Sequence, residues 1–148
     1  MTAPGSADDP YNLARFQEAQ AGTAEPALAE LWRGRKTGHW MWFIFPQLEG
    51  LGASHMARRY ALASLEEARA YLRHPVLGPR LIAFTQAANR HAGRSAREIF
   101  GSPDDLKFRS SMTLFAAAAP GEPLFVRALD IFFGGKADPL TIARLVPA

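Results

Sequence analysis

FGSPDDLKFRSSMTLF, at residues 100–115, contains the clearest helix signal of the sequence. Ser102 precedes Pro103, which places a capping hydroxyl directly before a proline suited to the first position of a helix. Two aspartates follow in the expected first turn, where negative charge interacts favourably with the helix dipole. The segment therefore predicts a helix from Asp104 to about Ala117.

Helix-start signals of two kinds recur outside this segment. An aspartate followed by proline occurs at 9–10 and 138–139, and the spacing of a capping box occurs at 64–67 and 95–98. Apolar residues repeat at helical spacing between these points, for example at Leu28, Leu31 and Trp32. Glycines stand where helices should end, at Gly34, Gly93 and Gly134-Gly135. These signals predict seven or eight helices joined by short loops.

One segment, WMWFIFPQLEGLG (40–52), does not follow this pattern. It is aromatic and contains a proline and two glycines, which favours either a buried strand-like stretch or a single helical turn. One such segment cannot form a sheet alone. The predicted fold class is therefore mainly α, a single compact domain with at most one short strand-like segment. Residues 1–8 are expected to form a mobile N-terminal tail, and residues 9–148 the helical domain.

The composition excludes several classes of protein. A chain of 148 residues fits one domain, and 48% apolar with 21% charged residues argues against disorder. The absence of cysteine excludes disulfides, thiol catalysis and thiolate metal sites. Apolar runs such as MWFIF (41–45) are too short to cross a bilayer, and MTAPGSADDP (1–10) lacks the apolar centre of a signal peptide. We expect a soluble cytoplasmic protein.

A first cluster of polar and aromatic residues occupies GRKTGHWMWFIFPQ (34–47). Arg35 and Lys36 can hold a phosphate or carboxylate, while the indoles of Trp40 and Trp42 can stack on a flat ligand. A basic helix end followed by a hydrophobic core segment is the alternative.

Two further polar residues favour the ligand-site interpretation of this segment. His39 and Gln47 are interleaved with the aromatic residues, and a purely structural core segment does not need them. The net charge of +3 is compatible with an anionic ligand, but it is too small to indicate nucleic acid on its own.

A second cluster lies on the helix predicted from Asp104. Lys107, Ser110 and Ser111 share one side of this helix, because residues three and four apart are neighbours. Serines compete with the backbone for hydrogen bonds and are uncommon together inside helices. Their presence indicates either close helix packing or a polar ligand site.

Common cofactor motifs fail on inspection. GRKTG (34–38) lacks the glycine spacing of a phosphate-binding loop, and GLGASH (50–55) ends in histidine where a dinucleotide fingerprint needs glycine. The four histidines show no paired metal spacing. We therefore expect no metal and no cofactor.

Four blocks of the sequence resemble a known bacterial family, Domain of Unknown Function 1810, which is sometimes labelled calpastatin. The blocks are RFQEAQ (15–20), GRKTGHWMWFIFPQLEGLG (34–52), YLRHPVLGPRL (71–81) and FGSPDDLKFRSSMTLF (100–115). The resemblance implies a mainly helical single domain. Two of the blocks contain the polar clusters, which fits a shared ligand site and equally a shared packing solution.

The leading functional hypothesis is a small anionic ligand, nucleotide-like or phosphorylated, that the protein binds, hydrolyses or otherwise transforms without metal. The predicted ligand-binding residues are Arg15, Arg35, Lys36, Trp40, Trp42, Gln47, Lys107, Ser110 and Ser111. The predicted catalytic residues, which would transfer protons, are His39, Asp104 and Asp105. If both clusters form one site, they must meet in space. The alternatives are a nucleic-acid-binding accessory domain and a protein-interaction scaffold with an exposed apolar patch near 40–45 or 131–133.

Overall fold

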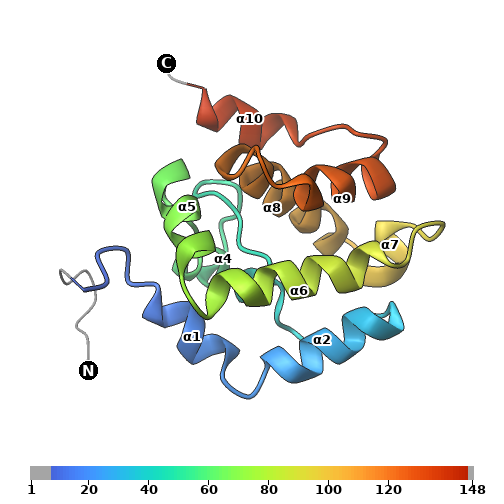
Figure 1. Ribbon diagram of the computed structural model, residues 1–148, viewed down its shortest axis with the longest axis horizontal. Coiled ribbons are helices and arrows are strands. Elements are labelled where there is room, and N and C mark those ends of the chain that lie inside the picture. The colour runs from blue at the N-terminus through green and yellow to red at the C-terminus, as the bar shows by residue number, and fades with distance from the viewer. Residues whose placement is uncertain (1–7, 147–148) are drawn as a thin grey trace.

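The architecture was determined as a computed structural model, which describes residues 8–146 and contains ten helices and no sheet in that range (Figure 1). The helices are α1 (Ala14–Gln20), α2 (Ala24–Arg33), α3 (Met41–Ile44), α4 (His55–Arg59), α5 (Leu65–Arg73), α6 (Leu77–Asn89), α7 (Ala96–Phe100), α8 (Asp104–Ala118), α9 (Pro123–Phe133) and α10 (Pro139–Leu145). The predicted mainly α fold is confirmed. The predicted tail, residues 1–8, lies outside the described residues except for Asp8.

The predicted number of helices, seven or eight, is too low. The two additional helices are α3, within the aromatic segment that the sequence left ambiguous, and α4, which follows the capping serine Ser54. Both are short, with four and five residues, so neither shows a full helical repeat in the sequence. A parallel bridge pairs Leu48 with Leu62, and no strand longer than a single bridge residue occurs within residues 8–146.

The helix-start signals succeed where the side chain itself reaches the backbone. Ser95 and Glu98 form a complete capping box on α7. Asp138 accepts the amide of Thr141 (3.0 Å) and caps α10. The prediction for Ser102 is wrong, because α8 begins after Pro103 and has no side-chain cap.

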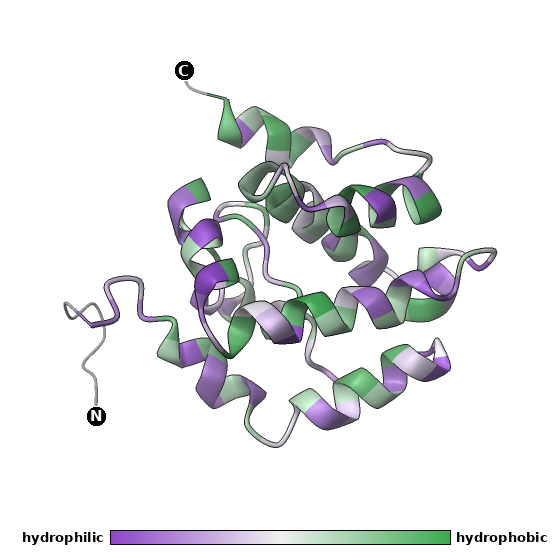
Figure 2. Ribbon diagram, in the orientation of Figure 1, coloured by the Kyte–Doolittle hydropathy of each residue, from purple (hydrophilic) through white to green (hydrophobic). Residues whose placement is uncertain are grey.

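Two long helices organise the packing. α6 contacts α2, α5 and α9, while α8 contacts α5, α7, α9 and α10. Figure 1 shows α6 running across the molecule, with α2 on one side and α8 and α9 on the other. Figure 2 shows apolar and polar residues alternating along α2, α6 and α9, as expected for helices with one buried side.

Helix α8 is buried on most of its sides, and this explains part of its unusual sequence. Phe108 and Phe115 are fully buried, and Phe108 stacks on Phe100 with ring centres 4.5 Å apart. The hydroxyls of Ser110 and Thr113 donate to carbonyls one turn earlier (3.1 and 2.8 Å). Small hydroxyl residues satisfied within the helix let other helices approach closely.

The aromatic segment at residues 40–45 belongs to the core rather than to the surface. Met41, Phe43, Ile44 and Phe45 are buried, and Phe45 contacts the ring of Phe108 at 5.0 Å between centres. The exposed apolar patch that a scaffold would need is therefore not at 40–45. Within residues 8–146, no helix combines the length and the apolar character that crossing a membrane requires.

Candidate functional site

The two polar clusters of the sequence meet at Asp104, at the start of α8. Lys36 Nζ lies 2.9 Å from Asp104 Oδ2, and Lys107 Nζ lies 3.1 Å from Asp104 Oδ1. The two segments, almost seventy residues apart in sequence, therefore meet in space at the pair of Lys36 and Asp104, while a pocket shared by the two clusters stays a prediction. Lys36, Asp104 and Lys107 form an ion cluster, with two positive charges and one negative charge.

Asp104 is firmly ionised in this arrangement. Burial acts to raise its pKa, but hydrogen bonds and charge from Lys36 and Lys107 outweigh burial and hold the pKa below its usual value. A carboxylate between two ammonium groups is a weak proton acceptor. The geometry thus gives Asp104 an organising role for the two lysines.

The loop that presents Lys36 is fixed by a buried carboxylate that the sequence reading missed. Glu30 Oε1 accepts the amides of Thr37 (2.7 Å) and Gly38 (2.8 Å) and the indole of Trp40 (3.0 Å). Burial acts to raise the pKa of Glu30, but these hydrogen bonds outweigh it and lower the pKa. The available signal was the position of Glu30 between Ala27 and Leu31 on the buried side of α2, where an unpartnered carboxylate would be costly.

Lys36 binds within the fold, to a carbonyl of the loop that Glu30 holds and to Asp104. Its side chain is 8% exposed, and Nζ donates to Gly38 O (2.6 Å) in addition to the pair with Asp104. Nζ also lies 5.1 Å from the ring centre of Trp40, which is itself 2% exposed. Trp40 is therefore core and offers no face on which a ligand could stack.

Lys107 is in a different situation. Its side chain is 25% exposed, and Asp104 is its one ion-pair partner among residues 8–146. Its ammonium group lies 5.2 Å from the ring centre of Trp42, a half-buried indole whose Nε1 has no hydrogen-bond partner in the described residues. Lys107 thus retains N–H donors that the protein does not use.

A cleft of about 580 Å³ lies beside Lys107, and we call it the α8 cleft. Its walls are the 47–57 loop, the first half of α8 and the start of α10. The lining of the cleft includes Gln47, Leu51, Leu106, Lys107, Arg109, Ser110, Asp138 and Leu140. Of the predicted ligand-binding residues, the cleft brings together Gln47, Lys107 and Ser110.

Two charged residues of the α8 cleft are partly committed to the fold. Arg109 donates from Nε to Lys136 O and from Nη2 to Ala137 O, both at 2.9 Å. Asp138 Oδ2 accepts the amide (3.0 Å) and the hydroxyl (2.6 Å) of Thr141. Nη1 of Arg109 has no hydrogen bond with the described residues, so Arg109, like Lys107, retains N–H donors that the fold does not use.

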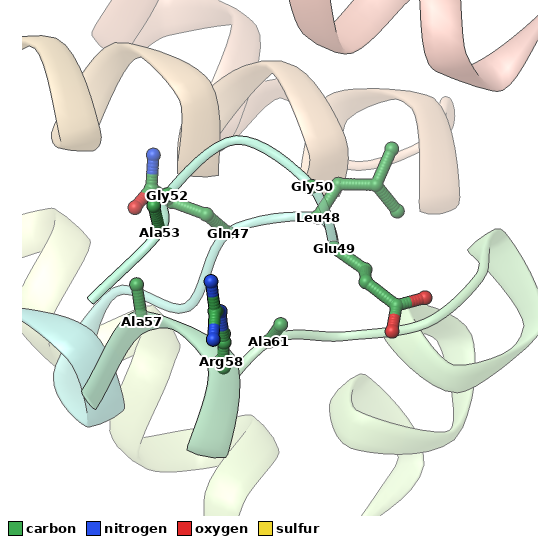
Figure 3. Close-up of a pocket in the computed structure, with 9 residues that line it drawn as sticks. All are labelled: Gln47, Leu48, Glu49, Gly50, Gly52, Ala53, Ala57, Arg58 and Ala61. Atoms are coloured by element: carbon green, nitrogen blue, oxygen red, sulfur yellow. The ribbon is translucent and has the colours of Figure 1, made fainter. Parts of the chain in front are cut away.

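A neighbouring hollow of about 370 Å³ shares Gln47 with the α8 cleft. Figure 3 shows Arg58 projecting from α4 towards the 47–53 loop, while the carboxylate of Glu49 points away from Gln47. The two recesses adjoin each other, since both are lined by Gln47, Gly52, Ala53 and Ala57.

Arg15, a predicted ligand-binding residue, uses its whole guanidinium within the fold. Its five N–H donors bind the carbonyls of Tyr11, Asn12, Arg59 and Ala61 and the carboxylate of Glu67, at 2.6 to 3.0 Å. This leaves no N–H for an anion. Arg15 instead ties α1 to the chain around α5.

Besides Arg15, Trp40 and Trp42, four predicted residues lie outside the lining of the α8 cleft and outside the ion cluster. Arg35 and His39 are exposed on the loop beside Lys36, and Asp105 accepts the amide of Leu106 at 2.9 Å. Ser111 is fully buried, and its hydroxyl has no partner in the described part of the chain. No group of three or more histidines and carboxylates within residues 8–146 is arranged to hold a metal ion.

Comparisons with known proteins agree with this fold. The model of a family described as "Protein of unknown function (DUF1810)" matches residues 10–145. The crystal structure of a conserved hypothetical protein from Mycobacterium tuberculosis is 54% identical in sequence, with a TM-score of 0.92. The match covers 95% of this chain and 100% of that one. No curated protein matches the chain.

Proposed function

We propose a function for this chain, which belongs to the DUF1810 family of proteins of unknown function, from the residues of the α8 cleft. The protein binds a small anionic molecule, such as a phosphorylated metabolite, that also has an apolar part. The cleft volume of about 580 Å³ is within the usual range for small-molecule sites, roughly 300–1,000 Å³.

The observation that carries this proposal is the unused hydrogen-bonding capacity of Lys107. Lys36 and Lys107 share Asp104, so the ion cluster keeps one net positive charge, and Lys107 is its more exposed member. Arg109 adds a guanidinium edge on the same wall of the cleft. Two cations with free N–H groups favour a phosphate or carboxylate group.

The remaining lining residues favour a ligand with an apolar part. Leu106 and Leu140 are 56% and 67% exposed, and Leu51, on the loop before α4, is a half-buried residue of the lining. Gln47 and Ser110 supply neutral polar groups. A few polar groups among apolar side chains is the usual composition of a small-molecule site.

Binding is better supported than hydrolysis or group transfer. General base catalysis needs a carboxylate or imidazole that is free of structural work, whereas Asp138, the carboxylate of the cleft, caps α10 through Oδ2, which accepts the amide and the hydroxyl of Thr141. Asp104 is held ionised between two lysines. We therefore leave His39 and Asp105, which do not line the cleft, out of the proposed site.

The test is a thermal-shift screen with sugar phosphates, ADP-ribose, nicotinamide dinucleotide and inorganic phosphate. A molecule that binds the native state raises the melting temperature in a concentration-dependent way. Lys107→Gln should weaken its binding about tenfold, the scale of one charge-assisted hydrogen bond. Arg73→Gln, which removes an exposed charge at the end of α5, is the matched control and should leave binding unchanged. Equal binding by wild type and Lys107→Gln would remove the α8 cleft as the site.

A further inference from the structure

A second recess lies between the end of α6 and the start of α9, two helices that pack against each other (Figure 1). We call it the α6–α9 hollow, and its lining consists of Gln86, Asn89, Arg90, Leu124 and Arg127. Its volume is about 290 Å³, and an adjoining recess of about 230 Å³ continues it along α9. It shares no residue with the α8 cleft. Together the two recesses reach the size range of small-molecule sites.

Asn89 provides an unsatisfied acceptor in this hollow. The residue is only 9% exposed, and its Nδ2 donates to Leu124 O at 3.3 Å. This bond fixes the orientation of the amide, since the reverse orientation would place two oxygens against each other. The carbonyl oxygen Oδ1 is buried and has no hydrogen-bond partner in the described residues. Buried acceptors without a partner are uncommon in native proteins, so Oδ1 indicates a place for a donor from outside the chain.

Arg90 and Arg127 make the hollow positively charged. Neither forms an ion pair with any residue of the described range. The one carboxylate nearby is Glu122 of the adjoining recess, which accepts the amide of Leu124 at 3.3 Å and caps α9. The two guanidinium groups are therefore available to an anion.

An exposed tryptophan lies beside Arg90. The Cζ atom of Arg90 is 3.9 Å from the ring centre of Trp32, which is 51% exposed on α2. Trp32 follows the helical spacing of Leu28 and Leu31, but its indole lies largely on the surface of α2, beside Arg90. Stacking holds the guanidinium plane in place while its N–H groups remain free at the edge.

We propose that the α6–α9 hollow binds a nucleotide. The phosphate lies between Arg90 and Arg127, and an N–H of the base donates to Asn89 Oδ1. Gln86 offers a second amide to the edge of the base, since asparagine and glutamine amides pair with adenine through a donor and an acceptor together. Trp32 lies outside the lining of the hollow and contributes by holding the guanidinium of Arg90 through stacking. This proposal is independent of the one made for the α8 cleft, which shares no residue with the hollow and whose lining contains no unsatisfied amide.

The test is calorimetric titration of the full chain with adenosine monophosphate, adenosine and inorganic phosphate. The nucleotide should bind more tightly than either of its parts, because each part fills half of the site. Arg127→Gln, at an exposed position, should weaken nucleotide binding about tenfold or more. Arg73→Gln removes the same charge near the opposite end of α6 and should have no effect. Equal affinity of wild type and Arg127→Gln, or no binding of the nucleotide, would overturn the proposal.

Two further arms make the result specific. Asn89→Leu removes the unsatisfied oxygen and should weaken the nucleotide while inorganic phosphate binds as before; weakening of both would contradict the role given to Oδ1. Lys107→Gln, in the α8 cleft, tells the two sites apart. If Lys107→Gln lost nucleotide binding while Arg127→Gln kept it, the assignment of the nucleotide to the α6–α9 hollow would be overturned. A single-stranded oligoadenylate that binds more tightly than the mononucleotide and is weakened by Arg127→Gln would identify the nucleotide as part of a strand.

Discussion

The 34–40 loop and the first half of α8 both direct a lysine at Asp104, yet they differ in how completely their polar groups are satisfied. In the loop, Glu30 accepts three hydrogen bonds and Lys36 donates to a carbonyl and a carboxylate. On α8, Lys107 has one ion-pair partner in the described chain. The difference shows that a dense polar cluster in a sequence can contain, side by side, a loop whose polar groups are satisfied within the fold and a lysine with unused N–H donors.

The largest expected effect on the free energy of unfolding comes from removing the Glu30 carboxylate, which holds the 34–40 loop in place. Glu30→Ala removes the acceptor for the part-buried amides of Thr37 and Gly38 and leaves the buried indole N–H of Trp40 without a partner. Hydrogen bonds to charged groups contribute about 1.5–3 kcal/mol each and are not additive, so we expect a loss of about 3–5 kcal/mol in the free energy of unfolding. Urea denaturation of the purified variant measures this value.

Glu30→Gln is the control for this change. It keeps an oxygen at the acceptor position and removes only the charge, so a loss of about 1–2 kcal/mol is expected. If Glu30→Ala were no worse than Glu30→Gln, the three hydrogen bonds would not be what orders the loop.

The helices could be predicted from the sequence because their signals are local. Ser95 with Glu98 and Asp138 with Pro139 determine helix starts through contacts within one turn, and the structure confirms both. The short helix α3 could not be predicted in this way, because its four residues are apolar on all sides and are held by packing against α1 and against the ring of Tyr60.

The candidate site could be predicted only in part, for a related reason. The convergence of Lys36 and Asp104 follows from two unusual polar segments in one chain. Which donors remain free depends on partners distant in sequence, such as Glu67 for Arg15 and Glu30 for Trp40. Residue type alone therefore assigned Arg15 and Trp40 to ligand binding, although the fold uses the polar groups of both.

A second prediction compares the two lysines directly. Lys36→Met should lower the free energy of unfolding by about 2 kcal/mol, because it removes a nearly buried donor from Gly38 O and from Asp104. Lys107→Met should cost less than about 1 kcal/mol, since this ion pair is more exposed and Lys36 still neutralises Asp104. Thermal and urea unfolding of both variants give the comparison. Arg35→Gln, an exposed charge on the same loop, is expected to stay within about 0.5 kcal/mol of wild type; equal losses for Lys36→Met and Lys107→Met would mean that the two sides of Asp104 do not differ.

The smallest expected effect is a dependence of stability on pH, which tests whether the 34–40 loop is held by the negative charge of Glu30. Its pKa is lowered in the folded protein from the usual value of about 4.5. A carboxylate with a lowered folded pKa contributes stability that is fully present above its unfolded pKa and is lost as the pH falls towards the folded pKa. Asp104 has a lowered pKa as well and adds to the same loss of stability at acid pH.

Wild type should therefore be more stable than Glu30→Gln at neutral pH, by the 1–2 kcal/mol expected above. This gap should shrink as the pH is lowered below about 4.5, because protonation turns Glu30 into a neutral group like glutamine. Urea unfolding of both proteins over a pH series measures the gap, and a gap that stays constant into the acid range would show that the carboxylate charge contributes nothing to holding the loop.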